Sequence, residues 1–171
     1  MSEGGSSSRL RGKISSDLDT MQELFEQVGW TPGRESIRPD QDTIMRKNQF
    51  LDEVERSYET LGDQVLHVLF SMAPEVGTTG KYTIASKDQL APQRRFERNT
   101  FAYQGLAPET KHFIMWYTFG PPALTDEQIT SDIEHDIKVR IGHNNFEFVW
   151  YENPKMSVPG LYHLQVFWRK L

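Results

Sequence analysis

Apolar residues follow their clearest pattern in the carboxyl-terminal third of the chain. Two aromatic-rich runs, Phe146–Tyr151 and Leu161–Trp168, flank a segment that contains Asn, Pro and Gly. Short runs rich in Phe, Trp, Tyr and Val, with such boundaries, predict two paired strands. A third run, His112–Thr118, is apolar on both faces, which is typical of a strand in the middle of a sheet.

A helix is predicted between these strands. Thr125-Asp-Glu-Gln128 is a capping-box sequence, in which the Thr hydroxyl accepts from the third amide while Gln128 reaches back. Gly142 suits the end of the helix. The isoleucines of this segment recur four residues apart on one stripe: Ile129, Ile133, Ile137 and Ile141. The order strand, helix, strand, strand predicts an α+β fold, with the helix packed on an antiparallel sheet.

The amino-terminal half has weaker patterns. Residues 1–15 are rich in Gly and Ser and predict a disordered tail, because they cannot bury enough apolar area to offset the entropy lost on ordering. Helices are predicted from an N-cap at Ser16 to Gly29 and over Asp40–Leu61. Residues 63–72 predict either a short helix or a buried strand, and Lys81–Ala85 predicts a short edge strand.

The chain has 171 residues, which suits one domain with a substantial core. We expect a single α+β domain over residues 16–171. Its helical part is expected over residues 16–72, and its strand-helix-strand-strand part over residues 101–171.

The last strand has two different faces. Because side chains alternate along a strand, Tyr162, Leu164, Val166 and Trp168 share an apolar face that suits a core. The opposite face carries an imidazole, an amide and a guanidinium beside one aromatic ring: His163, Gln165, Phe167 and Arg169. This is more polar chemistry than a core needs, so the second face is a candidate site.

Composition narrows the classes of function. Hydrophobic content of 37% and charged content of 25% are typical of a soluble globular protein, and the net charge of −5 argues against broad nucleic-acid binding. The absence of cysteine excludes disulfides and a cysteine nucleophile, and is compatible with a reducing compartment. No apolar run approaches membrane-spanning length. We therefore expect a cytoplasmic protein, with a nuclear location left open and no membrane association.

Five histidines occur, but none has the spacing of a zinc-ligand pair, and we expect no metal and no cofactor. His163 has two interpretations. It is either a nucleophile or phosphate contact, or a half-buried histidine bonded to a neighbouring element. The three arginines within Gln93–Arg98 likewise form either a solvated face or an anion-binding patch facing the last strand.

Two resemblances follow from the carboxyl-terminal residues. The segments FAYQGLAPETKHFIMWYT and LTDEQI, followed by ENPKMSVPGLYHLQVFWR, resemble a family of uncharacterised, mostly fungal N-acetylglucosamine-induced-protein-like proteins. This resemblance covers about Phe101 to Arg169 and implies no settled biochemical activity.

The order of elements and the Ser-Val…His-Leu-x-Val pattern are also remotely similar to the histidine-triad (HIT-like) nucleotide hydrolases and transferases. In that superfamily the last strand carries His-x-His-x-His, and the middle histidine attacks phosphorus. If His163 corresponds to the first histidine, Gln165 occupies the position of the nucleophile. If His163 corresponds to the middle one, Leu161 occupies the first position and Gln165 the third, as in the uridylyltransferase branch. Neither alignment restores the triad.

Three hypotheses of function stay open. The first is an intracellular protein with a HIT-like fold that binds a phosphorylated small molecule or nucleotide without the usual catalysis. The second is a divergent nucleotidyl hydrolase or transferase with His163 as its catalytic residue, and the third is a protein-interaction module. The predicted ligand-binding residues are His112, Ser157, His163, Gln165 and Arg169.

Overall fold

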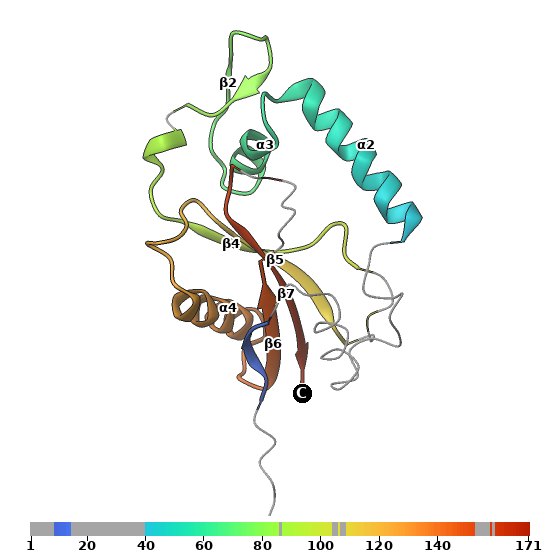
Figure 1. The fold of residues 1–171 in the computed structure, drawn as a ribbon, viewed down its shortest axis with the longest axis vertical. Coiled ribbons are helices and arrows are strands. Elements are labelled where there is room, and N and C mark those ends of the chain that lie inside the picture. Colours follow the sequence, from blue (N-terminus) through green and yellow to red (C-terminus); the bar gives the residue numbers. More distant parts are fainter. Residues whose placement is uncertain are drawn as a thin grey trace, which may run out of the picture.

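The structure is a computed structural model that describes residues 9–14, 40–85, 87–103, 106, 109–152, 158 and 160–171 (Figure 1). Its centre is a five-stranded sheet with the strand order β1-β6-β7-β5-β4. The strands are β1 (Arg11–Lys13), β4 (Arg94–Arg98), β5 (Lys111–Tyr117), β6 (Phe146–Tyr151) and β7 (His163–Lys170). All neighbours pair antiparallel except β1, which lies parallel to β6. The predicted α+β class is confirmed, as is the interior position of the strand that begins near His112.

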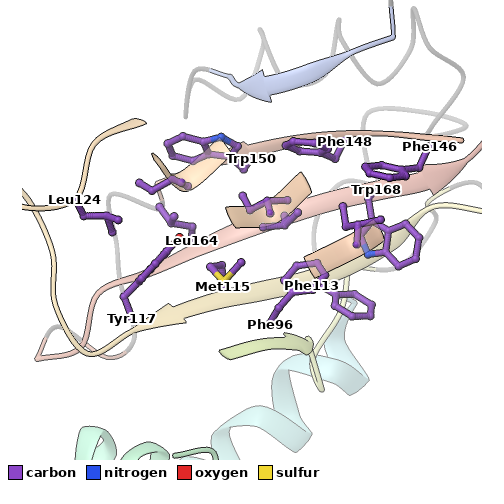
Figure 2. Close-up of a cluster of buried hydrophobic side chains, with 14 residues drawn as sticks. Phe96, Phe113, Met115, Tyr117, Leu124, Phe146, Phe148, Trp150, Leu164 and Trp168 are labelled. Carbon is purple, nitrogen blue, oxygen red and sulfur yellow. The ribbon is translucent and has the colours of Figure 1, made fainter. Parts of the chain in front are cut away.

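Helix α4 (Asp126–Ile141) packs on one face of this sheet and forms the main core with it. The Thr125 side chain accepts from the amide of Gln128, as predicted, and Gly142 ends the helix in the left-handed region at φ 76°. The Gln128 side chain does not reach back to Thr125 as predicted, because it donates to Asp132 one turn further along the helix. Ile129, Ile133 and Ile137 are completely buried. Figure 2 shows the aromatic and aliphatic side chains that the strands contribute to this core.

The opposite face of the sheet is also buried. Phe167 packs with Val149 and Tyr151 in one cluster, and Trp116 belongs to a second cluster with residues of α3 (Leu61–Val68). The second face of β7 was predicted to be mixed and partly polar. Its side chains are as predicted, but His163 and Gln165 are only 5% and 8% exposed.

Residues Arg11–Lys13 correct the prediction of a disordered tail over residues 1–15. They form β1, in which the amide of Ile14 donates to the carbonyl of Trp150 and the carbonyl of Leu10 accepts from the amide of Phe148. Arg11 forms an ion pair with Glu134 of α4. The prediction from low local hydrophobicity was wrong because β1 is stabilised by hydrogen bonds to an edge of the sheet and by carboxylates that are distant in sequence.

Helix α2 (Gln41–Ser57) begins at the N-cap Asp40 and ends four residues earlier than predicted. The next residues turn, and Thr60 caps α3, so the helical alternative for residues 63–72 is the correct one over Asp63–Val68. Both helices lie beyond the end of the sheet where β7 begins (Figure 1). The predicted helix Ser16–Gly29 lies outside the described residues.

A small hairpin accompanies α3. The predicted edge strand within Lys81–Ala85 is β3 (Tyr82–Thr83), which pairs antiparallel with β2 (Glu75–Val76) in a separate two-stranded sheet. A short 3-10 helix, η2 (Lys87–Gln89), follows it. None of the helices in the described ranges combines the length and apolar character needed to cross a bilayer.

Candidate functional site

The predicted site residues of β7 share one face but do not converge. Strands rise by about 3.3 Å per residue, so His163 and Arg169 are separated by roughly 20 Å along the strand. The three polar residues of the strand therefore lie in three different surroundings. Ser157, which was also predicted to bind the ligand, lies outside the described residues.

Arg169 is engaged by the neighbouring strand. Its Nε and Nη2 atoms lie 2.8 Å and 2.7 Å from Oε1 of Glu147, its cross-strand partner on β6. The second oxygen of Glu147 accepts from the amide of Leu10, next to β1. This half-buried pair links three consecutive strands of the sheet, so its geometry accounts for the arginine without a ligand.

His112 and Gln165 are brought together, and they bond to each other. Nε2 of His112 lies 2.5 Å from Oε1 of Gln165, across the β5–β7 ladder. Nδ1 of His112 accepts a hydrogen bond from the amide of Tyr103 at 3.1 Å. The proton of the neutral ring therefore sits on Nε2, and Gln165 accepts it.

The surroundings of His112 keep the ring neutral. The side chain is 3% exposed, stacks on Phe167 at 4.4 Å between ring centroids, and meets the edge of Tyr103. Burial lowers the pKa of His112 to about 4, although the hydrogen bond to Gln165 opposes that shift. Asn99 extends the network, because its Nδ2 donates to the same Gln165 oxygen while its Oδ1 accepts from Phe101. Both ring nitrogens of His112 are thus engaged inside the protein.

His163 lies at the first position of β7 and is arranged differently. Its Nδ1 lies 2.9 Å from the carbonyl oxygen of Leu161, which can only accept, so Nδ1 carries the proton of the neutral ring. The ring stacks on Trp116, its cross-strand partner, at 4.6 Å between centroids and 28° between planes. Within the described residues Nε2 of His163 makes no hydrogen bond. An oriented imidazole with its lone pair on Nε2 can accept a proton or contact an electrophile.

A lysine of α2 acts on this imidazole. Burial lowers the pKa of His163, the hydrogen bond to Leu161 opposes that shift, and the positive charge of Lys47 lowers the pKa further. An anion beside the imidazole would offset the charge of Lys47 and so favour protonation of the neutral ring. The end of β7 next to α2 is therefore the candidate site.

Lys47 was missed by the sequence analysis. It is half-buried and lies on the stripe of α2 that faces the protein, together with Thr43, Phe50 and Val54. The spacing of these residues, four, three and four, is the helical spacing of an inner face. A lysine at an inner position of an amphipathic helix is the signal from which this residue could have been predicted.

The arginine cluster does not face the last strand. Its residues belong to β4, and β5 lies between β4 and β7. Arg94 forms a bidentate pair with Asp136 of α4, with both bonds at 3.0 Å, and Arg95 donates to the carbonyl of Leu69. Arg94 thus points to the α4 face, away from His163, whereas Arg95 lies in one row with Trp116 and His163 but donates to backbone carbonyls. The three arginines therefore do not form one anion-binding patch facing the last strand.

The other histidines stand apart from the site. Nδ1 of His67 bonds to the hydroxyl of Tyr58 at 2.6 Å, and Nδ1 of His143 accepts from the amide of Asn145. His135 is exposed on α4. In the ranges that the structure describes, no three acidic or histidine side chains are grouped to hold a metal ion.

Comparisons with known proteins add little to this geometry. No protein-family model matches the sequence, and no curated protein matches it. A crystal structure of HTC1 is similar with a TM-score of 0.44 and 10% sequence identity, over 94% of this chain and 85% of the HTC1 chain. So remote a similarity assigns neither a fold family nor a function. The two resemblances drawn from the sequence stay predictions.

Proposed function

We propose that the protein binds a small phosphorylated molecule at the end of β7 that faces α2, with His163 and Lys47 as the contacts to the phosphate. The observation that carries the proposal is the orientation of His163. Its Nδ1 is bonded to the carbonyl of Leu161, its ring is stacked on Trp116, and its Nε2 has no partner in the described part of the chain.

Electrostatics support an anionic ligand. The charge of Lys47 disfavours a positive charge on His163, and the cost of charging the imidazole falls when a dianion lies beside it. A phosphate group offers oxygens that accept from an ammonium and an imidazolium at once. The proposal is limited to ligand binding. Contacts from His163 and Lys47 can hold a phosphorylated ligand without any covalent reaction at His163.

A divergent nucleotidyl hydrolase or transferase is the second candidate. It is favoured by one observation, the lone pair that the Leu161 contact leaves on Nε2 of His163. Gln165, which follows two residues later, bonds to His112 through its carbonyl oxygen. A transferase mechanism would therefore rest on His163, with Gln165 held by its own network.

The test is a thermal-shift titration of the full chain with inorganic phosphate, AMP, ADP and glucosamine 6-phosphate. At least one of these compounds should raise the melting temperature, and His163→Ala should remove that increase. His135→Ala is the matched control, because it deletes an exposed imidazole of α4, which packs on the opposite face of the sheet from His163. If none of the four compounds shifts the wild-type protein, both candidate functions fail.

Turnover separates the two candidates. Release of nucleotide or phosphate from a nucleoside diphosphate, lost in His163→Ala and kept in His135→Ala, would favour the enzyme. A thermal shift without turnover supports the binding protein.

A further inference from the structure

A groove of about 640 Å³ lies between the edge strand β4 and helix α4, on the opposite side of β5 from β7. Arg94, Arg95, Val139 and Arg140 are among its lining residues. It is independent of the site at His163. We propose that this groove binds an extended acidic segment of a partner protein, which adds to β4 as a further strand.

The backbone of β4 presents unpaired groups to the groove. The amide of Asn99 donates to the carbonyl of His112, and the amide of Thr118 donates to the carbonyl of Gln93. Because hydrogen-bonded pairs alternate in an antiparallel ladder, the backbone groups of Arg94, Phe96 and Arg98 point away from β5. Their three N–H groups make no hydrogen bond to the described residues. An added strand would supply the missing carbonyl acceptors.

Two of the outward carbonyls are occupied by arginine side chains. Nη2 of Arg140 donates to the carbonyl of Phe96 at 3.2 Å, and Nη1 of Arg95 donates to the carbonyl of Arg94 at 2.9 Å. These guanidinium groups therefore already lie along the path that a partner backbone would follow. The guanidinium of Arg140, on the α4 face, has further N–H groups for a carboxylate of the partner.

The charge of the groove selects an acidic strand. Asp136 is neutralised by its bidentate pair with Arg94, so Arg140 and the exposed Arg98, at the end of the same strand, carry the free positive charge on the α4 side of β4, whereas Arg95 and Glu97 point to the other face of the sheet. Charged side chains on an edge strand also prevent non-specific pairing with the edge strands of other sheets. The same charges admit a strand that brings carboxylates and reject one that brings lysines.

The alternation of β4 predicts the pattern of the partner. Arg94 and Phe96 point toward α4, and an added residue directly opposite either one places its side chain on the same face. That face holds Arg140 and Val139, of which Val139 is 70% exposed. Acidic residues are therefore expected at every second position of the bound segment. A nucleic acid is disfavoured, because Phe96, the aromatic ring of the groove, is 7% exposed and offers no stacking surface.

The probe is a fluorescein-labelled heptapeptide that alternates glutamate and threonine, titrated into the full chain and followed by anisotropy. Saturable binding is expected, and a peptide with lysine for glutamate should bind at least about tenfold more weakly. N-methylation of the glutamates blocks the amides that face β4 and should abolish binding. N-methylation of the threonines blocks amides on the outer edge and should leave binding unchanged.

Protein variants complete the test. Arg140→Gln should weaken binding by about tenfold, whereas Lys138→Gln should not, although it removes the same charge from the same helix. Binding should also slow hydrogen exchange at the amide of Phe96. The proposal is overturned by absence of saturation, by equal binding of the two N-methylated peptides, by equal effects of the two variants, or by tighter binding of an oligothymidylate.

Discussion

Nε2 of His112 donates a hydrogen bond of 2.5 Å to Oε1 of Gln165, which joins two side chains that sequence alone assigned to a ligand. The contact crosses from β5 to β7 on a buried face of the sheet. Tyr103 and Asn99 complete the network from the segment that follows β4. The most polar part of the last strand therefore stabilises the fold, and the candidate site is confined to the strand's first residue.

Replacement of His112 by Ala should destabilise the protein strongly. The change leaves the oxygen of Gln165 and the amide of Tyr103 without their partner in a buried place, so the free energy of unfolding should fall by about 3 kcal/mol. Urea denaturation measures this loss. His135→Ala is the control, since its imidazole is exposed, and it should change the free energy by less than about 0.5 kcal/mol. Equal effects of the two changes would contradict a buried network.

The same histidine predicts how stability depends on pH. In the folded chain the pKa of His112 is about 4, while the unfolded chain takes the ordinary value near 6.5. Between these two values only the unfolded chain is protonated. Stability is therefore full above about pH 6.5 and falls by roughly 3 kcal/mol as the pH drops to 4.

Urea unfolding at a series of pH values tests this dependence. His112→Gln removes the titrating group, so its curve should be flatter than the wild-type curve over the same interval. His135→Gln should keep the wild-type slope, because its imidazole is exposed. Parallel curves for wild type and His112→Gln would refute the assignment.

Deletion of residues 1–14 tests strand β1. Leu10 and Ile14 pack against the cluster of Val149, Tyr151 and Phe167, and the deletion removes them together with the backbone bonds to β6. We expect a loss of about 3 kcal/mol and faster aggregation through the exposed edge of β6. Deletion of residues 1–8, which retains Arg9–Ile14, should leave the unfolding midpoint unchanged. If both deletions behave alike, β1 does not hold the sheet edge.

Regular periodicity made much of the fold predictable. The bounds of β6, the two caps of α4 and its buried isoleucines all follow from local residue patterns, because a helix or strand with one buried face repeats its apolar residues. Strand β1 could not be predicted in this way. Three residues with two positive charges carry no periodic signal, and their partners Phe148 and Glu134 lie more than a hundred residues away.

The candidate site was only partly predictable for the same reason. Alternation placed His163, Gln165 and Arg169 on one face correctly. It could not reveal that Glu147 lies opposite Arg169, that His112 reaches Gln165, or that Trp116 lies opposite His163. Those pairs depend on the register between strands, which cannot be read from the residues of one strand alone.

The last prediction concerns the charge that Lys47 exerts on His163. Burial and Lys47 both lower the pKa of the imidazole, so removing the lysine charge should raise that pKa, and reversing the charge should raise it more. We expect the order Lys47→Glu above Lys47→Gln above wild type, measured by NMR titration of the ring signals of His163. Lys138→Gln and Lys138→Glu are the controls on α4 and should leave the value unchanged. An identical pKa in all five proteins would show that α2 does not bring its lysine to the end of β7, and the proposed phosphate site would lose its lysine contact.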